Sequence, residues 1–379
     1  MRRNSVLALS GVALSVCGLL AAVPGTAQAK PEGATYLALF GDAPYGTTNT
    51  DTAEFRDTPA FIDDINADPD VSDVVHVGDI HSGKQNCTEA YDRSVAQLFT
   101  QFRQSLVYTP GDNEWADCHK PGEGGGKGVD YADGNPVANL DLIRSIFFPT
   151  PGQTLGQGNL HVTSQATAYD PAHPEDAAYV ENVRWQRKGV QFVTLNLPGG
   201  SNNDADVWFG AATETAQQHD ERVARTAADL RWLDAAFAQA TADDAHAVVV
   251  VTQADMWDVD GKSPAHLTNY EPFVKSLADH TNALGRPVLL FNGDSHVYRS
   301  DNPFSATAPC ETEAADHSTV PCAGSVAASH PGYDVPDFHR ITVHGSTFPL
   351  EWLKLTISPR PDGTFGPFSW ERHTTSLSS

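Results

Sequence analysis

Five short apolar runs in this chain end in polar segments, and four of these segments contain Gly-Asp. The runs are mostly continuous rather than alternating, which is typical of strands covered on both faces of a sheet. In α/β sheets, the loops beyond the carboxyl ends of the strands meet in one crevice. We therefore expect the five segments to meet: Gly41-Asp42-Ala43-Pro44-Tyr45, Gly78-Asp79-Ile80-His81, Gly111-Asp112-Asn113-Glu114, Thr252-Gln253-Ala254-Asp255 and Asn292-Gly293-Asp294-Ser295-His296.

Helical patterns separate several of the apolar runs, and this alternation predicts an α/β sheet layered by helices. The expected strands cover residues 35–40, 73–77, 105–108, 190–195, 247–252, 288–291, 341–343 and 353–357. The expected helices cover residues 91–103, 139–147, 215–240 and 271–283. Loops rich in Gly or Pro at 121–134, 149–158 and 302–336 are interpreted as insertions, so residues 30–379 are predicted to form a single domain.

The N-terminus has the three regions of a secretory signal peptide. Arg2 and Arg3 precede a largely apolar stretch that ends in Ala27-Gln28-Ala29. We predict that residues 1–29 are removed near Ala29 and that the protein is secreted. A membrane anchor is the alternative, although Ser and Gly interrupt the stretch. No later segment is long and apolar enough to suit a membrane span.

The chain is strongly acidic, with a formal net charge of −24. Loss of Arg2 and Arg3 with the signal peptide moves this charge to about −26. We expect no nucleic-acid binding, because so acidic a protein has no sequence-independent attraction for nucleic acid or anionic membranes. The carboxylates fit solubility, or cation binding where they converge.

Four cysteines follow the predicted cleavage site, and an even number in a secreted chain favours disulfides. Of the three possible connectivities, we expect the local pairs Cys87–Cys118 and Cys310–Cys322. A zinc cluster is the alternative, although the sequence contains no Cys-x-x-Cys pair.

Carboxylates that converge in one crevice repel one another and resist desolvation unless a cation neutralises them. Aspartate oxygens together with the imidazole of His296 suit one or two divalent or trivalent metal ions. The alternative is that each Gly-Asp is an ordinary turn, since both residues are common in turns. Four such pairs after apolar runs, joined by His296, favour the metal site.

The ordered motifs resemble those of the calcineurin-like metallophosphoesterase superfamily, from about Thr35 to Arg299. The family pattern is D-x-H, G-D, G-N-H-[ED], a lone His and G-H-x-H. The resemblance implies two packed mixed β-sheets flanked by helices, which form a four-layer αββα sandwich. It also implies that a metal-bound hydroxide attacks a phosphoester, either a small molecule or a phosphorylated surface substrate.

The resemblance assigns a role to each matching position. Asn113 falls where the family has a histidine that contacts the phosphate or leaving group, and Glu114 falls at that histidine's acidic partner. The implied metal ligands are Asp42, the bridging Asp79, Asp112, Gln253, Asp294 and His296.

Several family histidines are replaced in this chain; Pro44, for example, occupies the histidine position of the first motif. Oxygen ligands replace nitrogen, so the site is predicted to favour Mn, Mg, Ca or ferric ions over Zn. His81 is a candidate catalytic acid or ligand and Tyr45 a candidate ligand or substrate contact; for both, hydrogen bonding to a ligand is the alternative. Asn203 is a candidate substrate contact or an ordinary turn residue.

The sequence thus predicts a secreted, metal-dependent phosphomonoesterase or phosphodiesterase. The missing imidazoles leave open a non-catalytic, metal-containing binding protein on the same fold, because positioned acid–base groups contribute strongly to catalysis. A hydrolase of another bond is a further alternative.

Overall fold

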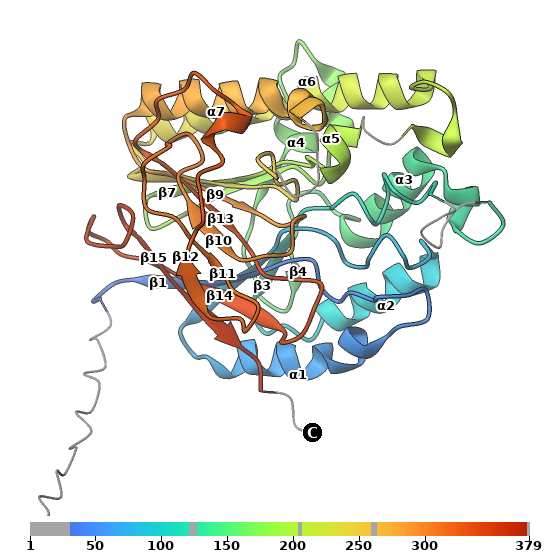
Figure 1. Cartoon of the computed structure of the whole chain (residues 1–379), viewed down its shortest axis with the longest axis horizontal. Helices are drawn as coiled ribbons and strands as arrows, with labels where there is room; N and C mark the ends of the chain where they lie inside the picture. The colour runs from blue at the N-terminus through green and yellow to red at the C-terminus, as the bar shows by residue number, and fades with distance from the viewer. Residues whose placement is uncertain (1–30, 121–126, 204–206, 259–263, 377–379) are drawn as a thin grey trace, which may run out of the picture. The chain divides into compact units, whose positions relative to one another are not determined.

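The computed structural model describes residues 31–120, 127–203, 207–258 and 264–376 (Figure 1). The predicted signal peptide lies outside the described residues and stays a prediction. The chain from Glu32 to Ser379 forms one compact unit. Within the described part of the chain, none of the helices has both the length and the apolar character needed to cross a membrane.

The first sheet contains six strands in the order β15-β14-β1-β2-β3-β4, counted over the described residues. Its centre is parallel, because β1 pairs parallel to β2 and β2 pairs parallel to β3. Strand β14 pairs antiparallel with β1 along the edge of β1 that faces away from β2. The bounds are β1 Thr35–Phe40, β2 Val71–His76, β3 Ser105–Tyr108, β4 Leu155–Gly156, β14 Glu351–Ile357 and β15 Phe368–Thr374.

The second sheet contains nine strands in the same described residues, in the order β12-β11-β10-β13-β9-β8-β7-β6-β5. Its four central strands, β13, β9, β8 and β7, run parallel. The bounds are β5 Thr163–Ser164, β6 Val183–Arg187, β7 Val190–Thr194, β8 Ala247–Val251, β9 Val288–Asn292, β10 Arg299–Asp301, β11 Glu311–Glu313, β12 Thr319–Pro321 and β13 Phe338–Thr342.

The side chains of β1 divide between two apolar layers, as the two-residue period of a strand requires. Leu37 and Leu39 point into a core that lies between the two sheets, where they join Phe192 and Phe291 of the second sheet. Ala38 and Phe40 join the core on the opposite face of the first sheet. Strand β1 is therefore covered on both faces, which explains its unbroken apolar run.

Three helices cover the outer face of the first sheet: α1 Ala53–Ala67, α2 Glu89–Phe99 and α3 Pro136–Phe147. Two helices, α6 Ala216–Ala242 and α7 Glu271–Leu284, cover the outer face of the second sheet. Figure 1 shows α6 and α7 on one side of the strands and α1 and α2 on the other. The described chain is thus a four-layer αββα sandwich, and the predicted fold class is confirmed.

Each strand and helix expected from the sequence has a counterpart in the structure, with bounds that differ by a few residues. Helix α1 was not expected. Its buried positions, including Thr58, Phe61, Ile62 and Ile65, follow the helical period, but Pro59 interrupts the pattern. The remaining short elements are α4 Gln165–Ala168, α5 Gly199–Asn203, η2 Tyr131–Gly134, η3 Pro174–Ala178, η4 Trp208–Gly210, η5 Pro264–Tyr270 and η6 Ala327–Ser329.

Candidate metal centre

Three predicted metal ligands from distant parts of the chain lie together. Asp42 follows β1, Asp79 follows β2 and His296 follows β9, and their ligand atoms all lie within 4.8 Å of one another. Both carboxylates are buried, whereas the His296 side chain retains 32% of its exposure. The carboxyl ends of β1, β2 and β9 therefore supply one shared site, as the sequence predicts.

In two of the four Gly-Asp pairs, the glycine makes room for the carboxylate of a different loop. A Cβ atom on Gly111 would lie 1.9 Å from Oδ1 of Asp79, and one on Gly293 would lie 2.3 Å from Oδ2 of Asp42. Real Cβ atoms essentially never approach other atoms so closely. The Gly-Asp pairs are therefore needed for close packing of the loops, and this packing brings the carboxylates together.

Four of the predicted metal ligands have left-handed backbone conformations. Their φ angles are 48° for Asp42, 59° for Asp79, 72° for Asp294 and 64° for His296. Such conformations cost on the order of 1–3 kcal/mol each in non-glycine residues and persist only where the surroundings hold them. Backbone hydrogen bonds hold the first loop: the amide of Asp42 donates to the Gly78 carbonyl over 2.9 Å.

The two oxygens of the Asp42 carboxylate differ in their hydrogen bonding. Its Oδ1 accepts a 3.0 Å hydrogen bond from the Asp294 amide and lies 3.5 Å from Nε2 of His296. Its Oδ2 is buried and has no hydrogen-bond partner in the described chain. A buried carboxylate oxygen without a partner is costly, and a bound cation would satisfy it.

Burial raises the pKa of both Asp42 and Asp79 well above the ordinary value. For Asp42, the Asp294 amide opposes this rise and the Asp294 charge adds to it. For Asp79, the charges of Asp112 and Glu114 raise the pKa further. Removing water from several neighbouring carboxylates disfavours their charged forms, so a positive ion fits the centre.

Gln253 lies between two of the predicted ligands. Its Nε2 donates to Oδ2 of Asp79 over 3.1 Å and to Oδ1 of Asp112 over 3.0 Å. Its Oε1 accepts a 2.5 Å hydrogen bond from the Gly199 amide. The side-chain amide thus joins the carboxylates of Asp79 and Asp112 by donated hydrogen bonds.

Asp112 and Asp294 both face the short left-handed turn α5. A Cβ atom on Gly199 would lie 2.5 Å from Oδ2 of Asp112 and 2.7 Å from Oδ1 of Asp294. Burial is the main cause of the raised pKa of Asp112, and the charges of Asp117 and Asp294 add to it. The two carboxylates thus border the Asp42–Asp79–His296 group without belonging to it.

Asn113 and Tyr45 connect the buried carboxylates to the partly exposed side of the centre. Nδ2 of Asn113 donates to the Tyr45 hydroxyl over 2.7 Å and to Oδ2 of Asp79 over 2.9 Å. The Tyr45 ring meets the His296 ring edge-on, with centroids 5.0 Å apart. Burial and the Asp79 charge raise the Tyr45 pKa, so the hydroxyl keeps its proton and can donate it in a further hydrogen bond.

Glu114 and His81 support the loops from inside the protein. Oε1 of Glu114 accepts from the Gly111 amide at 2.7 Å and from the Tyr108 hydroxyl at 2.5 Å. The His81 ring is fully buried, and its Nδ1 donates to the Ser82 carbonyl over 3.0 Å. Burial lowers the pKa of His81, so its imidazole is neutral.

The Asn203 side chain forms hydrogen bonds with two other side chains of the protein. Its Nδ2 donates to Oε2 of Glu221 over 3.0 Å, and its Oδ1 accepts from the Trp208 indole at 2.9 Å. Asn203 is buried, with 5% of its surface exposed. These contacts fix the end of turn α5.

His76 is a supporting residue that the sequence analysis did not single out. Its Nε2 donates to the Ala43 carbonyl over 2.7 Å, and its Nδ1 accepts from the Gly78 amide at 3.0 Å. This buried imidazole joins the loops that carry Asp42 and Asp79. The sequence feature that could have indicated this role is a histidine inside the apolar run Val75-His76-Val77.

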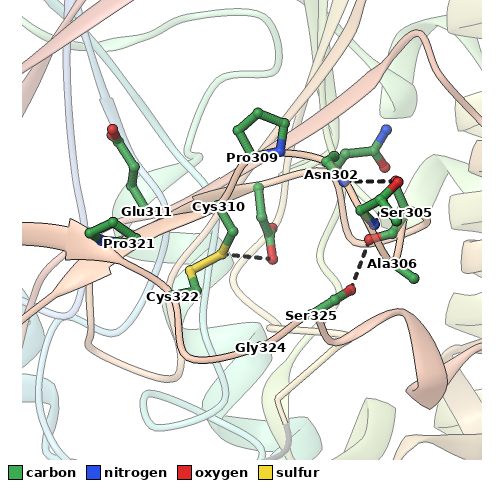
Figure 2. A pocket seen from close by; sticks show the side chains of 13 residues that line it. Asn302, Ser305, Ala306, Pro309, Cys310, Glu311, Pro321, Cys322, Gly324 and Ser325 are labelled. Carbon is green, nitrogen blue, oxygen red and sulfur yellow. Dashed lines mark hydrogen bonds between the residues drawn. A yellow bond between two sulfur atoms is a disulfide. The ribbon is translucent and has the colours of Figure 1, made fainter.

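Both predicted disulfide pairs are confirmed. Cys87–Cys118 lies behind the centre, where Sγ of Cys87 is 3.3 Å from the Asn113 carbonyl oxygen. Cys310–Cys322 lies beside a cavity of about 440 Å³ in the 302–336 insertion (Figure 2). The residues that line this cavity include none of the predicted metal ligands.

No protein-family model matches this chain. The comparison with curated proteins also finds no match. Among solved structures, the chain is similar to purple acid phosphatase PPD1 from yellow lupin (Lupinus luteus) seeds, with 11% sequence identity and a TM-score of 0.43. The alignment covers 90% of this chain and 52% of that protein, so the chain spans about half of that protein's length.

Proposed function

We propose that the protein is a metal-dependent hydrolase of phosphoesters whose cation is held by Asp42, Asp79 and His296. One observation carries this proposal: the three ligand atoms lie within 4.8 Å of one another, and Oδ2 of Asp42 is buried without a hydrogen-bond partner among the described residues. The resemblance of the ordered Gly-Asp motifs to metallophosphoesterases supports the same reaction.

We propose one cation in this centre, because the Gln253 amide already joins Asp79 to Asp112. Two carboxylates and one imidazole favour Mn, Mg, Ca or ferric ions over Zn. When bound, such an ion acts as a Lewis acid toward phosphoryl oxygens and lowers the pKa of water. The carboxylates alone would repel a phosphate anion, so activity should depend strictly on metal.

The partly exposed residues of the centre are proposed to contact the substrate. His296 is assigned to the cation, and the Tyr45 hydroxyl would donate a hydrogen bond to the leaving-group oxygen. Asn113 orients this hydroxyl and at the same time holds Asp79. Glu114 and His81 are buried, so we assign them positioning roles in the loops.

We further propose that the protein is secreted after loss of residues 1–29 and that the remaining chain is a single domain. Its two disulfides support an oxidising compartment, where such bonds form and persist. Small phosphoesters and phosphorylated surface molecules are the proposed substrates.

Turnover of p-nitrophenyl phosphate and bis(p-nitrophenyl) phosphate tests the proposal after a chelator-treated sample is reloaded with Mn, Mg, Ca or ferric ions. We expect metal-dependent hydrolysis of at least one ester. Asp79→Asn should lower it by more than the roughly 100-fold upper range for losing an outer partner of a metal ligand. Asp63→Asn, an exposed substitution on α1, is the matched control and should leave the rate unchanged. Undiminished turnover in Asp79→Asn would refute the proposed centre.

A non-catalytic, metal-containing binding protein is the second candidate. The position of Gln253 favours it, because a neutral amide stands between two carboxylates that resemble ligands of a second ion. The same assays separate the two functions. Metal binding that depends on Asp79, without turnover of either ester under any of the four metals, would identify the binding protein.

A further inference from the structure

We propose that Glu313, His317 and His344 form a second metal site, distinct from the Asp42–Asp79–His296 centre and suited to a zinc-type divalent cation. Glu313 ends β11, His317 lies in the turn between β11 and β12, and His344 follows β13. One ligand atom from each residue lies within 4.8 Å of the other two. This inference does not depend on the proposed hydrolase function.

The two imidazoles approach Glu313 through the same kind of atom. Nδ1 of His344 lies 2.8 Å from Oε2 of Glu313, and Nδ1 of His317 is hydrogen-bonded to Oε1. The side chains of Glu313 and His344 are 6% and 3% exposed, whereas that of His317 is 40% exposed. The potential ligand atoms thus converge at a point that solvent can reach through His317.

The second nitrogen of His344 is held as it is in metal-binding histidines. Nε2 lies 3.1 Å from the Thr347 carbonyl oxygen and 3.1 Å from the Pro349 carbonyl oxygen. Carbonyl oxygens only accept hydrogen bonds, so Nε2 carries a proton. Such a bond fixes the ring with Nδ1 facing Glu313, and a metal bound there would displace the proton on Nδ1.

A closed hairpin presents the other two ligands. The Cys310–Cys322 disulfide, drawn in Figure 2, joins the ends of the β11–β12 hairpin, and the Cys322 amide donates to the Cys310 carbonyl over 3.0 Å. Within the turn, the His317 amide donates to the Ala314 carbonyl over 2.9 Å. The hairpin therefore fixes Glu313 and His317 relative to one another, which lowers the entropic cost of binding an ion.

Arg372 is the nearby cation that could compete with a metal. Its Nη2 lies 3.2 Å from Oε2 of Glu313, but its guanidinium makes two shorter hydrogen bonds to Glu351, of 2.7 and 2.8 Å. Glu351 thus balances the charge of Arg372. A cation would replace the hydrogen bonds between Glu313 and the two imidazoles, and two nitrogens with one carboxylate suit Zn better than the harder ions.

An ion at this site would connect the hairpin to the loop that supports the Asp42–Asp79–His296 centre. Immediately after His344, the Gly345 amide donates to the His296 carbonyl over 3.1 Å, and the Ser346 amide donates to the Asp42 carbonyl over 2.7 Å. The proposed role is therefore structural, because the ion would brace this loop from outside the proposed catalytic centre.

Calorimetric titration of the chelator-treated full chain with Zn²⁺ tests the site in an Asp79→Asn background, which removes the other centre. We expect one bound equivalent, and His317→Ala should weaken binding by at least about 10-fold. His317 is exposed, so its removal should leave the fold intact, and Glu313→Gln provides a second variant of nearly unchanged shape. The control is His173→Ala, which alters an exposed His–Glu pair with a 3.0 Å separation.

The absorption spectrum of bound Co²⁺ gives a second readout, because it depends on the ligands of the ion and on their geometry. It should change in His317→Ala and Glu313→Gln but not in the His173→Ala control. Absence of Zn²⁺ binding, or equal Zn²⁺ affinity with and without His317, would overturn the site. Neither result would bear on ester hydrolysis, since Asp79→Asn already lacks the first centre.

Discussion

The two candidate metal sites meet the same geometric criterion but differ in their electrostatics. Asp42, Asp79 and His296 combine two buried carboxylates with one imidazole, whereas the second site combines one carboxylate with two imidazoles. In the first, neighbouring acids and burial raise the pKa of the aspartates. In the second, cationic Arg372 and hydrogen bonds from imidazoles already surround the carboxylate.

The contrast shows that ligand atoms can lie close together for two reasons: they can lack partners, or they can be partners of one another. Among the described residues, the first centre leaves a buried carboxylate oxygen without a hydrogen-bond partner, and a bound cation would satisfy this oxygen. At the second site, Glu313 already forms hydrogen bonds with His317 and His344, so a metal there must replace these bonds. We therefore expect the first centre to select hard ions and to control folding and activity, and the second to select zinc-type ions.

The largest expected effect concerns the space around Asp42. Gly293→Ala places a Cβ atom 2.3 Å from Oδ2 of Asp42, so the carboxylate must move. We expect Mn²⁺ affinity to fall by about 10- to 100-fold, the range for losing support of a metal ligand. Calorimetric titration with Mn²⁺ measures this change. Gly324→Ala is the control, because a Cβ atom there meets nothing within 4 Å; equal Mn²⁺ affinity in both variants would contradict the account.

An intermediate effect concerns the acid sensitivity of the loops around the first centre. Burial lowers the pKa of His76 from 6.5 to about 4. Below about pH 6.5 the His76 imidazole binds a proton in the unfolded chain but not in the folded chain. The free energy of unfolding therefore falls as the pH is lowered from about 6.5 toward 4. His76→Gln should reduce the stability difference between pH 7 and pH 4 by on the order of 2 kcal/mol.

Urea unfolding of the metal-free wild type and His76→Gln at both pH values measures this effect. The raised pKa values of the aspartates act in both proteins, so the difference between them isolates His76. An identical loss of unfolding free energy on acidification in the two proteins would show that His76 is not the buried neutral group described above.

The smallest expected effect on activity is that of replacing Asn203, which we place outside the substrate contacts of the first centre. Asn203→Gly keeps the left-handed backbone, whose φ is 65°, but removes the hydrogen bonds to Glu221 and Trp208. We expect the free energy of unfolding to fall by about 1–2 kcal/mol. The KM for the ester should change less than about threefold, since a substrate contact worth 1 kcal/mol would change it more. A large rise in KM with unchanged stability would instead make Asn203 a substrate contact.

The parts of the fold that the sequence predicted well are those with continuous apolar runs. Strands such as β1 and β8 are covered on both faces, so nearly every residue is apolar and the ends are visible as Gly, Asp or Gln. The same ends predicted that Asp42, Asp79 and His296 lie close together, and their ligand atoms do lie within 4.8 Å of one another. The local disulfide pairs followed from cysteine spacing.

The remaining features depend on contacts that a linear pattern does not encode. Helix α1 combines a helical period with an internal proline, and β15 has partly exposed residues along most of its length. The roles of His76 and Gln253 are hydrogen bonds between loops. The Glu313–His317–His344 cluster requires the register of β10 with β11 and β13, which no apolar run specifies.

Anomalous X-ray scattering from crystals of the Mn²⁺-loaded protein tests the central claim most directly. The account predicts a manganese peak bound by Asp42, Asp79 and His296, at ligand distances of roughly 2.0–2.6 Å, the range for hard divalent ions. A fully loaded crystal with manganese elsewhere, or with these three side chains too far apart to share one ion, would contradict it.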